Sequence, residues 1–378
     1  MHAVMDHIFV RLLAFVAGIL LALPLEMLHA PLAIGIKLAA AAALLGFAVM
    51  PLVIWLARRT GAMDYPGERR QHVQPTPRIG GLALVFAINL TLFLNFNYSL
   101  ELKGVCISAL IVAVVSFWDD LRGLSAAIKL FVQLLALAVL WWHGVHVEFA
   151  PPTWWGYGLE FIVTALWVVG ITNAFNFLDG INGLAASLAA AVTALMAILA
   201  DTTGQTYMLL LCLAMVGAAL GFLPDNARYS KPPRTFLGDV GSTYLGWMMA
   251  SIAVMGDWSS EGPLKAYAAP LLIFSVMIFD MIHTTVARIA RGDVRSVRQW
   301  IDYVGRDHLH HRLMDLGCSQ PQAVWVVVAM ALLIGLSALA LVRAQHLSVW
   351  LLLLQAIIFY ATLSFLMVKR GGKAARQS

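Results

Sequence analysis

Long apolar runs recur along this chain and restrict what it can fold into. Twelve runs reach or approach the roughly 20 residues that a helix needs to cross a bilayer of about 30 Å. Most are rich in Ala, Leu, Val and Gly on all sides, and twelve such helices cannot all be interior to a soluble fold. The runs lie at 8–28, 32–56, 79–98, 104–118, 126–142, 159–175, 184–200, 206–223, 241–256, 267–287, 323–342 and 347–368.

The composition also excludes a water-soluble protein. The chain has 61% apolar and 12% charged residues, against roughly 45–50% and about 25% in ordinary soluble domains. We therefore predict an all-α fold, a polytopic integral membrane helix bundle with about 11–12 transmembrane helices. Residues 1–378 form a single membrane domain in this prediction. N-terminal helices occupy 1–56, a core with polar motif loops occupies 57–322, and C-terminal helices and a basic tail occupy 323–378.

The N-terminal segment and the cysteines point to no processing or disulfide framework. Only Arg11 lies near the first apolar run and no small-residue cleavage site follows, so we expect a retained anchor rather than a signal peptide. Cys106, Cys212 and Cys318 are dispersed and lack CxxC spacing, so neither a disulfide framework nor a zinc cage is implied.

Positive charge fixes the predicted orientation. The loop 57–78 holds five arginines and is placed in the cytoplasm, and the other loops follow by alternation. On this assignment 20 of the 25 Lys and Arg residues are cytoplasmic and three lie on the opposite side. The net charge of +5 is thus explained by loops at a membrane, and no nucleic acid partner is predicted.

The first motif is the carboxylate pair Asp119-Asp120, directly after an apolar run. Adjacent ionised carboxylates near hydrocarbon repel each other, so a cation or a shared proton is needed to hold them together. Lys129, ten residues later, could meet a phosphate at the start of the next run. The alternatives are a solvated helix end for the acids and snorkelling to the interface for the lysine.

The second motif spans 173–183. Asn173, Asn176 and Asp179 recur every three residues, so on a helical end they share one side, and Gly180 lets backbone approach closely. Such oxygen-rich side chains suit a hard cation such as Mg²⁺. The alternative is an Asn/Gly-rich turn between two spans.

A third motif, Gly238-Asp239-Val240-Gly241-Ser242, opens an apolar run. Backbone amides at that helix start could face an anion while Asp239 holds a cation. The alternative is a helix N-cap made by Asp239.

A fourth motif contains His308, His310 and His311, flanked by Arg306 and Arg312. Three imidazoles could bind zinc, but no further ligand has a fitting spacing. Together with the arginines they better suit a diphosphate, and a solvated basic loop is the alternative.

Two other polar features are less specific. The segment 64–81, with two prolines and a Gly80-Gly81 pair, fits a binding lip and a rigid connector equally well. Asp280 and His283 lie in an apolar run and are interpreted as a structural polar pair.

Taken in this order, the motifs resemble those of the polyprenyl-phosphate N-acetylhexosamine-1-phosphate transferase superfamily, over roughly residues 60–320. The paired-Asp motif matches Asp119-Asp120 with Lys129, and the NxxNxxDG motif matches Asn173 to Gly180. The GDxGS motif begins at Gly238, and the HxHH motif begins at His308.

The resemblance implies transfer of a sugar 1-phosphate from a UDP-N-acetylhexosamine to a polyprenyl phosphate such as undecaprenyl phosphate, with release of UMP. It implies Mg²⁺ as cofactor, with Mn²⁺ as an alternative, and a site on the cytoplasmic face of a bacterial inner membrane. UDP-GlcNAc is the default donor, for a lipid-linked glycan such as an O-antigen, a teichoic acid or a capsule. Residues 57–322 then form the catalytic core, and a homodimer is left open.

The expected roles follow from the matched motifs. Asp239 and Asn176 would hold the metal, and Asp119 or Asp120 would deprotonate or orient the lipid phosphate. Phosphoryl transfer depends mainly on positioning and charge neutralisation, so basic groups would stabilise phosphate charge. The catalytic group comprises Asp119, Asp120, Lys129, Asp179, His308, His310 and His311, and the substrate-binding group comprises Asn173, Asn182, Gly238, Arg306 and Arg312.

Two departures from the family pattern affect specificity. The final Asp of the bacterial DGxDG form is Asn182 here, which we expect to contact uracil and which, unlike an ionised Asp, can also donate. The stretch 291–305 before the histidines is longer than expected and is a candidate for sugar selection.

Two rival functions stay open at this point. A phospho-MurNAc-pentapeptide transferase shares the motifs, although that branch tends to have three consecutive histidines. A secondary transporter would also have about twelve helices, but transporters place polar groups near the midplane and often repeat two halves.

Overall fold

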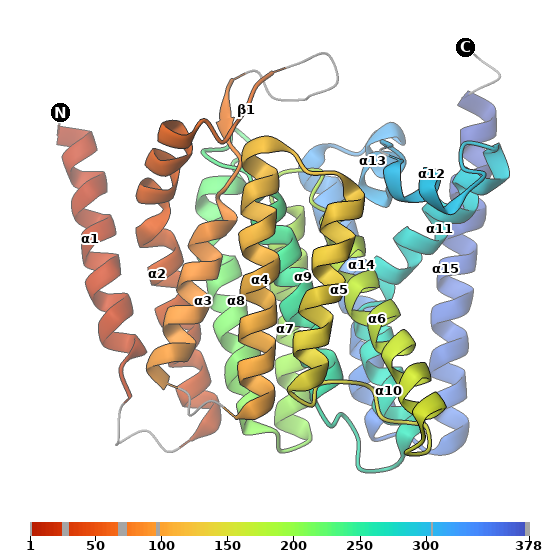
Figure 1. Cartoon of the computed structure of the whole chain (residues 1–378). Coiled ribbons are helices and arrows are strands. Elements are labelled where there is room, and N and C mark those ends of the chain that lie inside the picture. Colours follow the sequence, from red (N-terminus) through yellow and green to blue (C-terminus); the bar gives the residue numbers. More distant parts are fainter. Residues whose placement is uncertain (1, 25–29, 67–73, 96–98, 304, 375–378) are drawn as a thin grey trace.

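The structure is a computed structural model of the chain that describes residues 2–24, 30–66, 74–95, 99–303 and 305–374. Its helices and its two short strands lie in one bundle, with both termini at the same end (Figure 1). In chain order the elements are α1 (His2–Ala22), α2 (Pro31–Thr60), β1 (Met63–Asp64), β2 (Thr76–Pro77), α3 (Gly81–Asn95), α4 (Leu100–Arg122), α5 (Ala126–Trp142), α6 (Trp154–Phe177), α7 (Leu184–Thr202), α8 (Thr206–Asn226), α9 (Gly238–Met255), α10 (Pro263–Ile273), α11 (Ser275–Arg291), α12 (Val297–Asp302), α13 (Leu309–Asp315), α14 (Gln320–Val342) and α15 (His346–Ala374).

Each of the twelve apolar runs contains helix within its described residues, which confirms the all-α membrane bundle. Seven helices of the described part are long and apolar enough to cross a membrane, and the bent pair α10–α11 adds an eighth when counted as one span. The apolar helices Ile8–Ala22, Gly81–Asn95 and Ala126–Trp142 are shorter. Helix α9 lies in the interior, where residues 240–253 are all buried.

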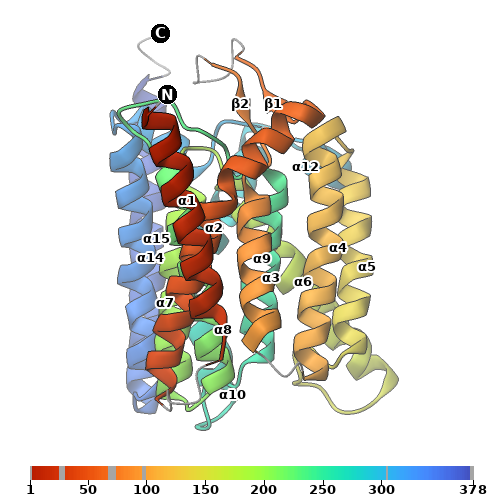
Figure 2. The ribbon, with the colours of Figure 1, turned by 90° about the vertical axis from the view of Figure 1, so that its left-hand side faces the viewer.

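The bundle core depends on close helix contacts at small residues. Helix α2 packs on α1, α3 and α8, while α9 packs on α4 and α6 (Figure 2). On α8, a Cβ at Gly217 or Gly221 would lie 1.9 Å from the Ala39 carbonyl oxygen or 2.2 Å from that of Ala43 on α2. Such small-xxx-small spacing is what lets membrane helices approach each other closely.

A backbone clamp joins the start of α3 to the start of α9. Strands β1 and β2 pair antiparallel, and β2 leads into Gly80 and Gly81, whose amides donate to the Phe236 and Leu237 carbonyls at 3.0 and 2.8 Å. The Phe236 amide donates back to the Pro77 carbonyl at 2.8 Å. A Cβ at Gly81 would lie 2.2 Å from the Gly241 Cα, so this approach requires glycine.

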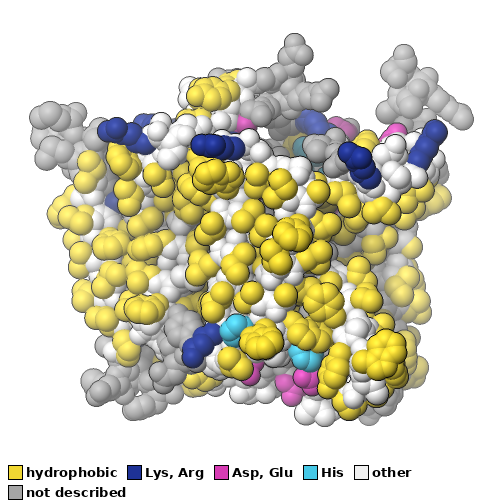
Figure 3. All heavy atoms as spheres, viewed as in Figure 1, with side chains coloured by type: hydrophobic (Ala, Val, Ile, Leu, Met, Phe, Trp, Pro, Cys, Tyr) yellow, Lys and Arg dark blue, Asp and Glu magenta, His cyan; other side chains and the backbone are white. Residues whose placement is uncertain are grey.

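The polar motifs collect at the end of the bundle that carries β1, β2 and α13. Helix α11 bends by 71° from α10 and leads through α12 to α13 at that end (Figure 1). In the view of Figure 3, hydrophobic side chains cover the middle of the bundle and most Lys and Arg side chains lie along this edge. Such an asymmetric basic edge is typical of the cytoplasmic side of a membrane protein.

Candidate active site

Lys129 joins two of the predicted acidic motifs. Its Nζ lies 2.8 Å from Asp119 Oδ2 and 3.0 Å from Asp239 Oδ2. The lysine lies in the first turn of α5, while the carboxylates come from the end of α4 and the start of α9. The Lys129 side chain is only 31% exposed, so it is held by the acids rather than extended to the interface.

The neighbouring Asp120 has different partners from Asp119. Its two carboxylate oxygens accept the backbone amides of Asp239 and Val240 at 3.1 and 3.0 Å. The amides at the start of α9 therefore do face an anion, as expected, but that anion is Asp120. The N-cap alternative for Asp239 is wrong, because Leu237 takes the cap position and no side-chain cap bond is made there.

The asparagines of the second motif meet polar side chains of α5 and α9. Asn176 Nδ2 donates to Asp239 Oδ1 at 3.1 Å and to Ser242 Oγ at 2.8 Å. Asn173 Nδ2 donates to Gln133 Oε1 at 2.8 Å, one turn after Lys129. The bond from Asn176 helps to fix the orientation of the Asp239 carboxylate.

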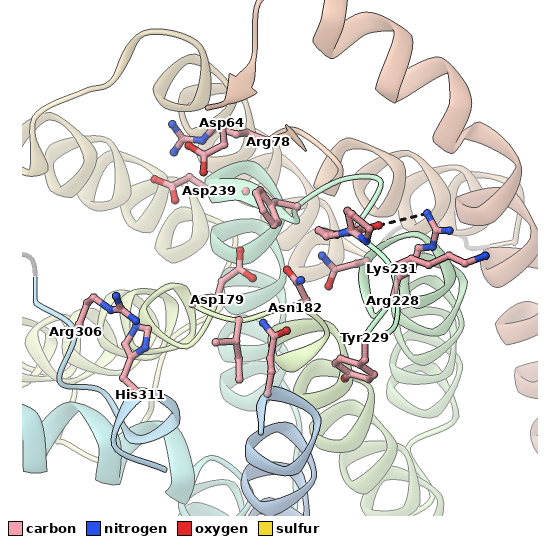
Figure 4. Close-up of a pocket in the computed structure, with 18 residues that line it drawn as sticks. Asp64, Arg78, Asp179, Asn182, Arg228, Tyr229, Lys231, Asp239, Arg306 and His311 are labelled. Atoms are coloured by element: carbon pink, nitrogen blue, oxygen red, sulfur yellow. Dashed lines mark hydrogen bonds between the residues drawn. The ribbon is translucent and has the colours of Figure 1, made fainter. Parts of the chain in front are cut away.

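A cavity of about 590 Å³ opens beside this cluster at the basic edge (Figure 4). Arg306 and His311 lie on one side of it and Arg228 and Lys231 on the other, with carboxylates between them. The lining combines residues from loops far apart in sequence: Asp64, Arg78, Asp179, Gly180, Ile181, Asn182, Asn226, Arg228, Tyr229, Lys231, Pro232, Pro233, Phe236, Gly238, Asp239, Arg306, His311 and Gln320.

The cavity is therefore lined by only some of the predicted site residues. Six of the predicted site residues border the cavity: Asp179, Asn182, Gly238, Asp239, Arg306 and His311. The other eight do not line it: Asp119, Asp120, Lys129, Asn173, Asn176, His308, His310 and Arg312. A second, much smaller cavity of about 20 Å³ touches Lys129, Asn173 and Asn176. Lys129 thus lies between the large cavity and the apolar interior.

The carboxylates of the cavity fit a divalent cation. Asp179 follows α6, and burial together with the Asp239 and Asp120 carboxylates raises its pKa well above the ordinary value. This repulsion between neighbouring acids is what a bound cation would relieve. No group of three or more His, Cys, Asp or Glu that could hold a metal occurs in the described ranges. Mg²⁺ commonly uses one or two carboxylates and completes its shell with water and phosphate.

His310 packs against the glycine of the second motif. Its side chain is fully buried, and a Cβ at Gly180 would lie 2.1 Å from its Nε2. Neither ring nitrogen has a hydrogen-bond partner among the described residues. Burial and the charges of His311, His308 and Arg306 lower the pKa of His310 to about 2, so the ring stays neutral. The His308–His311 motif thus contacts the turn that carries Asp179.

His308 is oriented by an acid of α11. Its Nδ1 lies 2.7 Å from Asp280 Oδ2, and Asp280 Oδ1 accepts the Leu309 amide at 2.6 Å. The interpretation of Asp280 and His283 as a polar pair is wrong, because His283 Nδ1 bonds Ser364 Oγ at 2.9 Å instead. A carboxylate that accepts a hydrogen bond from one imidazole nitrogen fixes the tautomer and the orientation of the ring.

The loop before His308 is held by an ion-pair network. Arg288 forms two hydrogen bonds with Asp307, at 3.0 and 2.6 Å, and Arg291 adds another at 2.9 Å. These arginines lower the pKa of Asp307 to about 2 although burial opposes the shift. The fourth motif is thus an ordered structure, and the solvated-loop alternative is wrong.

Comparison with known proteins identifies the family. Residues 102–257 match the model of glycosyl transferase family 4. The chain is 31% identical over 313 residues to a probable undecaprenyl-phosphate N-acetylglucosaminyl 1-phosphate transferase of Bacillus subtilis (strain 168), covering 80% of this chain and 83% of that protein. The chain belongs to glycosyl transferase family 4.

Other relatives of this family 4 member carry related names. A decaprenyl-phosphate N-acetylglucosaminephosphotransferase of Mycobacterium tuberculosis is 33% identical over 83% of this chain and 84% of its own length. A phospho-N-acetylmuramoyl-pentapeptide-transferase of Limosilactobacillus fermentum is 31% identical over 71% of this chain and 82% of its own length. The superfamily resemblance inferred from the motifs is confirmed.

The family match spans α4 to α9, yet the candidate site of this family 4 member extends beyond it. Arg78 lines the cavity, and its Nη2 lies 3.8 Å from Asp120 Oδ1. The segment 76–81 thus borders the cavity, as expected of a binding lip, and also connects α3 to α9 through the backbone clamp, as expected of a rigid connector. Residues 67–73 of the predicted lip lie outside the described residues. The sequence motifs single out none of Arg78, Arg228 and Lys231 as a site residue, because these residues counted only toward orientation and, for Arg78, as part of the segment 64–81.

Two further residues of the site left a signal in the sequence. Gln133 and Asp280 are polar residues within apolar runs, and both are buried. Polar groups inside membrane helices are costly and usually functional. That rule was available for Gln133, but only the structure shows that its partner is Asn173.

Proposed function

We propose that this family 4 member transfers N-acetylglucosamine 1-phosphate from UDP-GlcNAc to a polyprenyl phosphate, initiating a lipid-linked surface glycan. The observation that carries the proposal is the Asp119–Lys129–Asp239 cluster beside a cavity with basic groups on both sides. The names of the Bacillus and Mycobacterium relatives support the sugar and the polyprenyl acceptor.

The proposed reaction is a displacement at phosphorus. An oxygen of the lipid phosphate attacks the β-phosphorus of the UDP-sugar, and the bond from that phosphorus to the oxygen bridging to the α-phosphate breaks. UMP leaves with the bridging oxygen, and the product is a polyprenyl diphosphate sugar. Such reactions depend mostly on positioning and on stabilising phosphate charge.

Asp119 is better placed than Asp120 to handle the lipid phosphate. Asp120 is occupied by the amides of α9 and holds two helices together. Asp119 shares Lys129 with Asp239 at the boundary with the apolar interior, where a lipid phosphate would arrive. We therefore assign Asp119 to orient or deprotonate this phosphate and Lys129 to neutralise it.

The negative charge of the donor diphosphate requires further cations, beside the cavity and in addition to Lys129. We propose Mg²⁺, with Mn²⁺ as an alternative, held by Asp239 with Asp179 nearby, while Asn176 fixes Asp239 and stays a predicted ligand. Bound there, the metal would neutralise phosphate charge. Arg306 and His311 border the same cavity and would contact phosphate oxygens, and Asn182 stays the predicted uracil contact.

The proposal is tested with purified protein, polyprenyl phosphate and a panel of radiolabelled donors. Labelled lipid and released UMP are expected with UDP-GlcNAc and Mg²⁺, with none after chelation by EDTA and recovery on adding Mg²⁺ or Mn²⁺. Absence of labelled lipid with every donor would refute a transferase. Product from UDP-MurNAc-pentapeptide alone would assign the chain to the branch named by the Limosilactobacillus relative.

The transporter alternative receives no support from the structure or the family. The polar motifs lie at one end of the bundle rather than near its midplane, and the relatives are named as transferases. We propose that the motif end is cytoplasmic in a bacterial inner membrane, in line with its basic edge.

A further inference from the structure

Arg11 is a buried charge in a helix that otherwise presents apolar side chains. Its neighbours Phe9, Leu12 and Leu13 on α1 are 61%, 59% and 54% exposed, whereas Arg11 is 7% exposed. Its Nη2 donates to both carboxylate oxygens of Asp225 at 2.9 Å. An ionisable residue inside a membrane helix is expensive and indicates a function by default.

Asp225 lies at the end of α8 and also binds a second arginine. It is fully buried, and its Oδ1 accepts Arg234 Nη1 at 3.0 Å. Its backbone carbonyl accepts the Arg234 amide at 2.8 Å. These two bonds tie together the ends of the loop 226–233. Arg11, which lies outside this loop, binds the same Asp225 carboxylate.

The closed loop forms one wall of the cavity. Arg228, Tyr229 and Lys231 line the cavity from this loop, opposite Arg306 and His311 (Figure 4). Asn226 joins the same loop to the second motif, because its Oδ1 accepts the Gly183 amide at 2.6 Å. The position of the wall therefore depends on the anchor at Asp225.

Arg11 reaches this anchor across α2. Its guanidinium lies 3.8 Å from the centre of the Phe47 ring and donates to the Phe47 carbonyl. Truncating one partner of a buried pair leaves the other charge poorly compensated. Without Arg11, Asp225 keeps Arg234 as its one ion-pair partner among the described residues, the Arg234 side chain is 36% exposed, and the loop gains freedom to move.

We propose that Arg11 is a positioning residue for donor binding: through Asp225 it holds the wall that presents Arg228 and Lys231 to the donor phosphates. This inference rests on the proposed function. It gives the first helix, which lies outside the family match, a part in substrate affinity.

Steady-state kinetics of Arg11→Met tests the role. Loss of donor binding without loss of chemistry raises KM and spares kcat. We expect KM for UDP-GlcNAc to rise about tenfold, equivalent to about 1.4 kcal/mol, with kcat nearly unchanged, and Arg11→Lys to restore most of the affinity. The matched control is Lys37→Met, since Lys37 is a basic residue of α2 that does not line the cavity and that donates to the Leu23 carbonyl.

Trypsin cleavage after Arg228 gives a readout that needs no activity. Cleavage should be faster in folded Arg11→Met than in wild-type protein and in Lys37→Met. Lower thermal stability with unchanged KM and unchanged cleavage would overturn the inference and leave Arg11 a purely structural residue. A wild-type protein without activity on any donor would instead refute the proposed function, while the cleavage assay would still decide the positioning of the loop.

Discussion

Asp119 and Asp120 are adjacent in sequence yet have unlike surroundings. Asp119 shares Lys129 with Asp239, whereas Asp120 accepts two amides of α9 and so joins α4 to α9. Of these two adjacent aspartates, Asp119 thus has a proposed chemical role and Asp120 a structural one. The same division separates His311, which borders the cavity, from His310, which packs beneath it.

At Asp239 we predict that the substitution Asp239→Asn nearly abolishes transfer. The amide keeps the size of the side chain but removes the charge needed by a divalent ion and by Lys129. The measurement is labelled lipid formed at saturating Mg²⁺, with Asp257→Asn, exposed at the opposite end, as the control. Near-normal turnover would remove Asp239 from the metal site.

The low pKa of His310 predicts a stability effect at acidic pH. The folded-state pKa of about 2 lies below the unfolded value near 6.5. Below pH 6.5 the His310 imidazole therefore binds a proton in the unfolded chain and stays neutral in the folded chain. The contribution of His310 to stability is thus present above pH 6.5 and is lost as pH falls. Between pH 7 and pH 5 the Tm of His310→Gln in detergent should fall less than that of wild type. Equal falls would contradict this prediction.

At the scale of elements, short polar segments depend on contacts between helices distant in sequence. The turn after α6 lies against α13, where a Cβ added at Gly180 would lie 2.1 Å from His310 Nε2. The Asp280 carboxylate of α11 then fixes the start of α13 through His308 and the Leu309 amide. The position of the fourth motif is therefore set by α6 and α11 together.

Replacing Gly180 with Ala should separate these two elements. The added Cβ would lie 2.1 Å from His310 Nε2, so the His310 ring must shift, alone or together with α13, and activity should fall by about tenfold or more, as displacements near an active site commonly cause. The control is Gly170→Ala on α6, where nothing lies within 4 Å of the new atom.

A double variant sharpens this test. His310→Ala alone should weaken transfer with little loss of folded protein, because the ring packs beneath the cavity. In Gly180→Ala/His310→Ala the steric conflict is removed, so activity should match that of His310→Ala alone. Full activity of Gly180→Ala by itself would refute the contact.

At the scale of the whole molecule, the basic edge predicts the orientation in the membrane. Arg295 lies at the motif end and Asp257 at the opposite end, and both are exposed. In intact cells an impermeant maleimide should label Asp257→Cys and should label Arg295→Cys only after permeabilisation, with Cys318 replaced by Ser in both. The reverse pattern would overturn the cytoplasmic assignment.

The bundle was predictable from the sequence because apolar runs report membrane helices directly. The Asp, Asn and Gly motifs also indicated a shared site, since their chemistry is compatible with one ligand. The individual partners were not predictable: that Asp120 caps α9, and that Arg11 reaches Asp225 across 214 positions, depends on three-dimensional packing. The bend of 71° between α10 and α11, which directs α11 toward the site, lies within one continuous apolar run.

The clamp between the starts of α3 and α9 has a consequence for how such an enzyme can diversify. Its bonds run between peptide groups of residues 77–81 and 236–237, so they do not depend on which side chains these positions carry. The close approaches at Gly80, Gly81, Gly238 and Gly241 do restrict residue identity. Substitutions at Phe236 and elsewhere in the cavity lining can thus alter the preference for the proposed donor during evolution, while the main-chain framework that joins α3 to α9 is inherited unchanged.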